Sequence, residues 1–227
     1  MKIAIMDGSP KNKDSASGLI AAALQAELTP AADCAVCHAA SHDRDEIMAA
    51  LASCDALVFV FPLYVDGIPS HLLRLLDEIQ NDVATVAPGA AVYCAVNNGF
   101  YEAHQNGVAM ELMKNFCVRS GLRWGQGLGV GAGGMVQAAP IGRGPLANLG
   151  RALSAFAENI RNGVSADNSF VEPNFPKFLY NMIAHMSWRV QARGNGLKIG
   201  RLWRFKISEV DEWVQSGKSS DINKGGK

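Results

Sequence analysis

The sequence has no hydrophobic run that approaches the roughly 20 consecutive apolar residues needed to cross a lipid bilayer. It also has no recognisable signal peptide, because the apolar opening over residues 1–6 is short and runs directly into the turn Asp7-Gly8-Ser9-Pro10. We therefore expect a cytoplasmic protein that has no membrane partner.

Cysteine is scarce, and the five cysteines lie mostly in apolar surroundings: Cys34, Cys37, Cys54, Cys94 and Cys117. This placement predicts buried free thiols in a reducing compartment. The segment Cys34-Ala-Val-Cys37-His38 matches the c-type haem attachment pattern. Haem attachment requires export, however, and residues three apart on a strand point to opposite faces. Because the histidines also lack metal-ligand spacing, we predict neither a haem nor a metal site.

The chain has no net charge, since 21 Lys and Arg residues balance 21 Asp and Glu residues. The balance is uneven along the sequence: residues 1–176 carry a net charge of −6 and residues 177–227 carry +6. This asymmetry predicts a basic C-terminal segment with a role of its own. It can dock onto the acidic body or bind an anionic partner, and the sequence leaves both possibilities open.

Short apolar segments alternate with helical patterns along most of the chain. The apolar segments predict strands at residues 2–6, 32–38, 56–61, 90–96 and 124–130. Helical spacing of apolar residues predicts helices at residues 18–28, 45–53, 68–81, 108–120 and 154–162. Uniformly apolar strands are typical of sheets covered on both faces. We therefore predict an α/β fold with a doubly wound, open parallel sheet and a short C-terminal strand and helix appendage.

The loop after the first strand has the composition of a phosphate site. Ser9, Lys11, Ser15 and Ser17 lie close together there, at the start of a predicted helix whose N–H groups can bind an anion. The plainer alternative is that Ser15 or Ser17 only caps that helix. The loop lacks the Gly-Lys-Ser/Thr ending of a P-loop, which argues against a nucleoside triphosphatase. Asp7 would repel a phosphate unless its carboxylate points away or pairs with a lysine.

Two further loops follow buried strands, and ligands of open α/β sheets bind at such strand ends. The first offers an apolar wall and an aromatic face for a flat ring, with candidate residues Pro62, Leu63, Tyr64 and Val65. The second offers amide groups, a glycine for close backbone approach and two aromatic rings, with candidate residues Asn97, Asn98, Gly99, Phe100 and Tyr101. The alternatives are a simple strand-to-helix turn for the first loop and an isolated Asn-Gly turn for the second.

A glycine-rich segment over residues 131–150 has no clear period, and a loop of this length is usually functional or mobile. Gly129-x-Gly131-x-x-Gly134 matches a dinucleotide-binding fingerprint. No helical pattern follows at once, and no acidic residue stands near twenty positions further on. We interpret the match as a flexible loop.

Taken in order, Gly8-Ser-Pro-Lys-x-x-x-Ser-x-Ser17, Pro62-Leu-Tyr-Val-Asp-Gly-Ile-Pro69 and Asn97-Asn-Gly-Phe-Tyr-Glu102 resemble flavodoxin-like NAD(P)H-dependent FMN and quinone reductases. The resemblance spans residues 1–197, including Asn174-Phe-Pro-Lys-Phe-Leu-Tyr180 and Trp188-Arg-x-Gln-Ala-Arg-x-Asn-Gly-Leu197. It implies an FMN-binding domain over residues 1–165, with residues 166–197 as its extension.

The same resemblance implies that the 8–17 loop holds the phosphate of FMN and that the 62–65 and 97–101 loops flank its ring system. The chemistry is then the cofactor's, with NAD(P)H as co-substrate and a quinone, a flavin or another small molecule as electron acceptor. No catalytic side chain is implied, and a homodimer is expected. A flavodoxin-type electron carrier without its own NAD(P)H reaction is the alternative.

The basic tail over residues 198–227 resembles the second half of an excisionase-type DNA-binding domain. The first half of such a domain, which carries the helix-turn-helix, is absent, so no recognition helix is available for specific DNA readout. We therefore expect the tail to pack on the body or on a partner subunit rather than to bind DNA. A DNA-associated role is the second alternative.

Overall fold

The computed structural model describes residues 1–196 with the exception of residues 12, 30, 42 and 83–85. The chain divides into two compact units, residues 1–175 and residues 176–227. The excisionase-like tail, with its predicted strand and helix, lies outside the described residues. None of the helices in the described part of the chain is long and apolar enough to cross a membrane.

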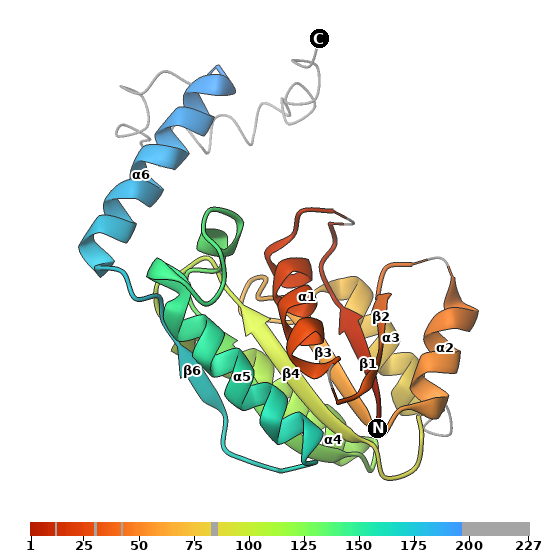
Figure 1. Ribbon diagram of the computed structural model, residues 1–227. Coiled ribbons are helices and arrows are strands. Elements are labelled where there is room, and N and C mark those ends of the chain that lie inside the picture. The colour runs from red at the N-terminus through yellow and green to blue at the C-terminus, as the bar shows by residue number, and fades with distance from the viewer. Residues whose placement is uncertain (12, 30, 42, 83–85, 197–227) are drawn as a thin grey trace, which may run out of the picture. The chain divides into compact units, whose positions relative to one another are not determined.

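The first unit is built on one sheet of six parallel strands in the order β2-β1-β3-β4-β5-β6 (Figure 1). The strands are β1 Lys2–Asp7, β2 Asp33–His38, β3 Ala56–Pro62, β4 Ala91–Asn97, β5 Arg123–Val130 and β6 Ser169–Val171. The α-helices of this unit are α1 Ala16–Leu28, α2 Arg44–Ser53, α3 Ser70–Asn81, α4 Gly107–Arg119 and α5 Ala147–Arg161. Three 3-10 helices are described as well: η2 Ala103–Asn106, η3 Gly133–Gln137 and η4 Gly144–Leu146.

Helices cover both faces of the sheet, which is why the strands are apolar along their whole length. On β3, alternate residues enter opposite cores: Leu57 and Phe59 pack with α2, α3 and α4, whereas Val58 and Val60 pack with α1 and α5. In Figure 1, α1 and α5 lie in front of the sheet while α3 and α4 lie behind it. The predicted doubly wound parallel sheet is therefore confirmed.

The strand order fixes where a ligand would bind. The chain moves outward from β1 to β2 and then returns to the other side of β1 to form β3. Doubly wound sheets with this order place their ligand site at the carboxyl ends of β1 and β3, where the winding reverses. The first two candidate loops leave the sheet at these two strand ends.

Among the strands and α-helices of the first unit, two differ most from the predicted ones. Helix α5 begins at Ala147, seven residues before the predicted start and inside the segment predicted to be a loop up to Gly150. Strand β6 has no counterpart among the predicted strands, because only three residues, Ser169–Val171, pair with its neighbour β5. A strand this short carries no readable alternation.

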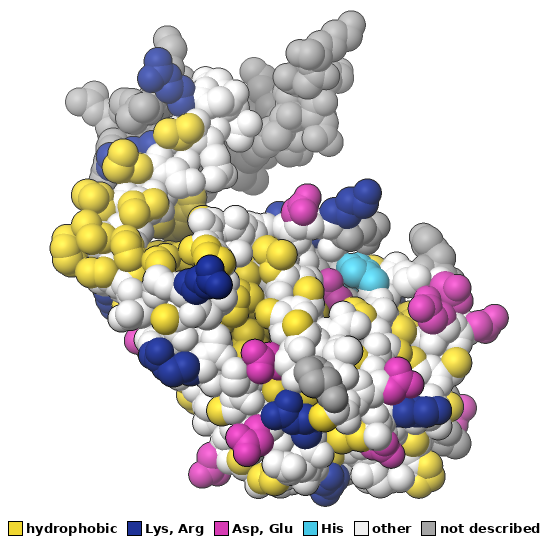
Figure 2. Space-filling model, in the orientation of Figure 1, with side chains coloured by type: hydrophobic (Ala, Val, Ile, Leu, Met, Phe, Trp, Pro, Cys, Tyr) yellow, Lys and Arg dark blue, Asp and Glu magenta, His cyan; other side chains and the backbone are white. Residues whose placement is uncertain are grey.

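The described part of the second unit consists of helix α6, Lys177–Gly194. None of its residues is buried, and it exposes Phe178, Met182, Ile183, Met186, Trp188 and Val190. Hydrophobic side chains gather over this helix in Figure 2, whereas charged side chains of both signs are scattered over the visible face of the first unit. Helix α6 also carries Lys177, Arg189 and Arg193 and no acidic residue.

Candidate functional site

The three predicted loops converge on a single residue, Asn97, at the end of β4. The hydroxyl of Ser17 donates to Asn97 Oδ1 at 2.7 Å, which joins the first loop to the third. The backbone N–H of Leu63 donates to the Asn97 carbonyl at 2.8 Å, which joins the second loop to the third. Segments more than 30 residues apart in sequence thus form one site at the carboxyl edge of the sheet.

The serines of the first loop have different roles. Ser15 caps α1, because its Oγ accepts the N–H of Gly18 at 2.9 Å. Ser9 is buried, and its Oγ accepts the N–H of Lys11 at 3.1 Å. Ser17 lies inside the first turn, so the capping alternative holds for Ser15 and not for Ser17. The side chain of Lys11 is exposed at the rim. The first turn of α1 still offers N–H groups that have no partner within the helix.

Gly8 allows the first loop to leave β1 against the neighbouring elements. A Cβ at this position would lie 2.7 Å from Leu72 Cδ2 on α3 and 2.8 Å from Phe61 Cβ on β3. Its N–H donates to the carbonyl of Val60 at 2.8 Å. Any larger residue would push the loop away from the sheet, so the glycine is required by close packing.

Asp7 does not pair with a lysine in the described residues, and its carboxylate does not point away from the loop. The side chain is buried, and Oδ1 accepts the N–H of Ser9 at 2.9 Å. The other oxygen lies against α1, since a Cβ at Gly18 would be 3.1 Å from it. Burial raises the pKa of Asp7, and the Ser9 N–H, His38 and His71 oppose that rise.

Two histidines that were not among the predicted site residues interact with this carboxylate. His38 ends β2 directly beside Asp7 in the strand register, and its Nε2 lies 3.3 Å from the carbonyl oxygen of Lys11. His71 lies in the first turn of α3. A sequence signal for His38 exists, because the last residue of the second strand of such a sheet must lie beside the end of the first.

The second loop is a tight turn between Tyr64 and Gly67, whose backbones exchange hydrogen bonds of 3.1 and 3.0 Å. Val65 and Asp66 occupy the left-handed region with φ of 48° and 57°. Tyr64 is 47% exposed and Val65 is fully exposed, whereas Leu63 is partly buried against the core. The predicted apolar wall consisted of Pro62, Leu63, Tyr64 and Val65. Of these residues, Tyr64 and Val65 offer the free surface.

The third loop uses its polar groups to hold its own shape. Asn98 Oδ1 accepts the N–H of Phe100 at 2.9 Å, and its Nδ2 donates to the carbonyl of Glu102 at 3.1 Å. The hydroxyl of Tyr101 donates to the carbonyl of Phe175 at 2.8 Å. Phe100 is 57% exposed. None of the described residues crowds Gly99, because a Cβ there would meet no atom within 4 Å.

The glycine fingerprint of residues 129–134 packs against this third loop. A Cβ at Gly131 would lie 2.2 Å from the carbonyl oxygen of Tyr101, and the N–H of Gly133 donates to the carbonyl of Asn98. The 3-10 helix η3 follows, and its Gln137 side chain donates to the carbonyl of Asp14 in the first loop. The segment thus contacts both the first and the third loop. Gly129 and Gly131 serve close packing, whereas a Cβ at Gly134 would meet no atom of the described residues within 4 Å.

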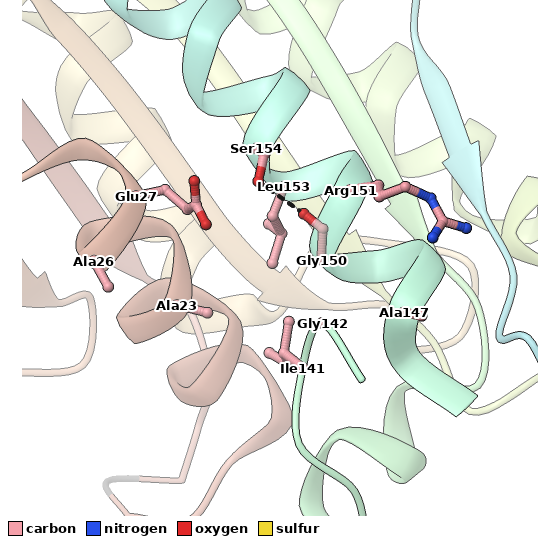
Figure 3. A pocket seen from close by; sticks show the side chains of 10 residues that line it. All are labelled: Ala23, Ala26, Glu27, Ile141, Gly142, Ala147, Gly150, Arg151, Leu153 and Ser154. Carbon is pink, nitrogen blue, oxygen red and sulfur yellow. Dashed lines mark hydrogen bonds between the residues drawn. The ribbon is translucent and has the colours of Figure 1, made fainter. Parts of the chain in front are cut away.

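A groove between α1 and α5 lies apart from these loops (Figure 3). It is lined mainly by small residues, and Gly150 allows α5 to approach Gly142, from which a Cβ would be only 2.4 Å away. Glu27 and Arg151 lie on opposite sides of the groove in this view, and the dashed line marks the bond from the Ser154 hydroxyl to the Gly150 carbonyl. The groove brings no converging set of polar groups together, so we do not assign it a ligand.

The described residues contain no cluster of ligands for a metal ion, and all five cysteines are free thiols. Cys34 packs on the side of α1 and α5, whereas Cys37 packs on the side of α2 and α3. The prediction that these two thiols point to opposite faces is therefore confirmed.

No family model and no curated protein matches this chain. Solved structures do match it. The NADH:FMN oxidoreductase EMOB in its apo form has a TM-score of 0.54 and 16% identity over 73% of this chain and 90% of its own. The flavodoxin of Streptococcus pneumonia TIGR4 has a TM-score of 0.53 and 13% identity over 72% of this chain and 100% of its own.

The Trp repressor binding protein of Bacillus subtilis has a TM-score of 0.50 and 15% identity over 69% of this chain and 98% of its own. At such low identity, the likeness is one of fold. The chain therefore has the flavodoxin-like α/β fold, with a candidate ligand site at its topological switch point.

Proposed function

We propose that this protein binds FMN and acts as an NAD(P)H-dependent oxidoreductase. The observation that carries the proposal is the convergence of the three loops on Asn97, at the sheet edge where this fold binds ligands. The residue types suit the parts of FMN, with hydroxyls and helix N–H groups in the first loop and exposed aromatic and apolar side chains in the other two. The sequence resemblance supports the same cofactor.

The described residues fit FMN with one exception. Ser9, Lys11, Ser15 and Ser17, together with the first turn of α1, would hold the phosphate, and Ser17 would do so through its backbone N–H because its hydroxyl donates to Asn97. The exception is Asp7, because its buried carboxylate repels a phosphate. When bound, FMN supplies the redox chemistry, accepting a hydride and passing electrons to an acceptor.

The remaining side chains of the site would bind and enclose the ring system. Tyr64 and Val65 would form one wall of the ring site, and Phe100 the other. The loops that carry them are fixed through Asn97 and Asn98. A rigid site of this kind orients a flat ring and excludes water from it without a side chain acting as acid or base.

Three further parts of the proposal concern partners and location. The electron acceptor is a small molecule such as a quinone or a flavin. The protein is a homodimer, in which a second copy covers the exposed side chains of Val65 and Phe100. The five free thiols suit a reducing compartment, which supports a cytoplasmic location.

The test is an FMN titration of the purified protein, followed by anaerobic mixing with NADH and with NADPH. We expect quenching of FMN fluorescence at one FMN per chain, and then loss of the oxidised-flavin absorption with at least one nicotinamide. Absence of FMN binding would overturn the proposal. Binding without reduction by either nicotinamide would instead indicate an electron carrier.

A further inference from the structure

Three titratable side chains from three different elements meet beneath the first loop. Asp7 ends β1, His38 ends β2, and His71 lies in the first turn of α3. Asp7 and His38 are direct neighbours in the strand register, and both histidines interact electrostatically with the Asp7 carboxylate. Within the 8–17 loop, Lys11 and Lys13 carry the positive charges that could offset this carboxylate.

The carboxylate of Asp7 and a bound phosphate would compete for the same backbone N–H groups. Its Oδ1 already uses the N–H of Ser9, and its other oxygen faces Gly18 in the first turn of α1. A phosphate dianion at this turn would place two like charges in a shielded site. Such an arrangement favours uptake of a proton, because protonation removes part of the repulsion.

Both ring nitrogens of His38 already lie at hydrogen-bond distance from backbone groups. Its Nδ1 accepts the N–H of Ala40 at 3.2 Å, and its Nε2 lies 3.3 Å from the carbonyl oxygen of Lys11. In this arrangement the neutral ring carries its hydrogen on Nε2. A second proton on Nδ1 would break the bond from Ala40.

The His71 ring can take that proton without breaking an existing bond, because its Nε2 has no hydrogen-bond partner among the described residues. Nε2 is also shielded from solvent, so the charged ring becomes favourable only when the negative charge of a ligand adds to that of Asp7. Burial lowers the pKa of His71, whereas the backbone of Gly8 and Ser9 and the charge of Asp7 act in the opposite direction. His38 adds to the lowering. The ring is thus neutral before a ligand arrives, and an added negative charge favours its charged form.

We propose that phosphate binding at the first loop is coupled to uptake of one proton, which His71 holds beside the Asp7 carboxylate. The proton comes from solvent and returns to it when the ligand leaves. The inference rests on the proposed function, since FMN is the phosphate ligand. It makes His71 a positioning residue for the phosphate, and it predicts that affinity for FMN falls with rising pH while affinity for riboflavin does not.

The experiment is a calorimetric titration with FMN and with riboflavin, from pH 6.5 to 8.5, in two buffers of different ionisation enthalpy. The second ionisation of a phosphate monoester lies near pH 6, below this range. We expect FMN binding to take up close to one proton in the upper part of the range, and the Kd for FMN to rise about tenfold for each pH unit there. Riboflavin, which lacks the phosphate, should take up none.

Three variants, Asp7→Asn, His71→Gln and His38→Gln, locate the proton, and a fourth serves as the control. Asp7→Asn removes the charge but keeps an oxygen for the Ser9 N–H, so we expect about tenfold tighter FMN binding at pH 8.5 and a flatter pH profile. His71→Gln keeps a polar side chain that cannot titrate, so its Kd for FMN should be higher than that of the wild type, most of all at pH 6.5, and should not change with pH. Asp33→Asn is the matched control, because Asp33 begins β2 at the amino end of the strand, far from the carboxyl ends where the site lies. It should leave the profile unchanged.

The outcomes separate this inference from the proposed function. If FMN binds with the same pH profile in the wild type, Asp7→Asn and His71→Gln, the inference is wrong and the proposed function stands. Loss of the profile in His38→Gln but not in His71→Gln would refute the assignment to His71. If FMN binds to none of these proteins at any pH, both proposals fail.

Discussion

The hydroxyl of Ser17 donates a 2.7 Å hydrogen bond to the side-chain oxygen of Asn97, although the two residues are 80 positions apart. Both side chains are buried, so neither can exchange this hydrogen bond for one to water without a loss of stability. The bond fixes the first turn of α1 against the end of β4. It is the direct link between the loop proposed to hold phosphate and a loop proposed to hold the ring.

Ser17→Ala should therefore destabilise the protein and weaken FMN binding together. Removing the hydroxyl leaves the Asn97 oxygen unpaired, which costs about 1–3 kcal/mol of unfolding free energy. Urea denaturation followed by circular dichroism measures this loss, and fluorescence titration measures the affinity. Ser53→Ala is the control, because the exposed Ser53 hydroxyl bonds to Ala49 within α2. Equal effects of the two substitutions would contradict the interpretation.

Gly131→Ala should distort the third loop, because the added Cβ would meet the Tyr101 carbonyl at 2.2 Å and the Ala103 N at 2.9 Å. Both obstacles are backbone atoms, so the chain itself must move. We expect a loss of at least about 2 kcal/mol in unfolding free energy by urea denaturation. Gly134→Ala is matched in chemistry and meets no atom of the described residues within 4 Å. Its midpoint should shift far less, and similar losses in both variants would refute the packing argument.

The doubly wound parallel sheet was predictable because most strands are apolar along their length and the connections are short, whereas the strand order was not predicted. A uniformly apolar segment such as Ala56–Pro62 is typical of a parallel sheet that is covered on both faces. Predicting the site required one more inference, namely that the loops at the carboxyl ends of different parallel strands lie together at one edge of the sheet. The positions of Ser17 and Asn97 follow from that inference, but the bond between them does not.

Two parts of the site could not be predicted in this way. Residue His71 lies in a helix, so its approach to Asp7 depends on how α3 packs on the sheet. Gln137 reaches Asp14 only because the 3-10 helix η3 returns toward the first loop. Neither relationship has a periodic signal in the sequence, because each depends on how separate elements pack together.

Val65 combines two unfavourable features, a φ of 48° and full exposure of a branched apolar side chain. Strain of this kind is typical of functional sites. Val65→Asn should raise the unfolding free energy by about 1 kcal/mol, because asparagine tolerates the left-handed region. The same change should weaken FMN binding by removing part of the apolar wall.

Thermal denaturation and FMN titration of the Val65→Asn variant measure the two effects. Val118→Asn is the control, since Val118 is exposed on α4 with a helical backbone and carries no such strain. A stabilisation as large in Val118→Asn would show that removal of an exposed valine, and not relief of strain, is responsible.

The thiols should differ sharply in reactivity. Burial raises the pKa of Cys54 to about 11 and that of Cys117 to about 12, and it raises the pKa of Cys94 as well. Cys37 is also buried with a raised pKa. Burial raises the pKa of Cys34 too, but its thiol is partly exposed whereas the other four are buried. A disulfide reagent at pH 8 should label Cys34 first in the native protein and all five thiols after unfolding. Cys34→Ser should abolish the early reaction, and fast labelling of this variant would contradict the assignment.

At neutral pH, the protein with Asp7 should be less stable than a variant that has an uncharged residue at position 7. Burial raises the pKa of its carboxyl in the folded protein above the ordinary value of 3.8. The folded state therefore binds this proton more tightly than the unfolded state does. The resulting contribution to stability falls as pH rises from below 3.8 through the folded pKa, and it stays low above that pH.

Asp7→Asn removes this dependence while its side-chain oxygen can still accept the Ser9 N–H. The variant should accordingly be more stable than the wild type at pH 7, and its advantage should shrink as the pH is lowered toward 3.8. Urea denaturation at pH 4, 5.5 and 7 measures the difference, with Asp33→Asn as the control at the exposed start of β2. An advantage that grew on acidification would mean that the Ser9 N–H and the two histidines outweigh burial and hold Asp7 in its charged form.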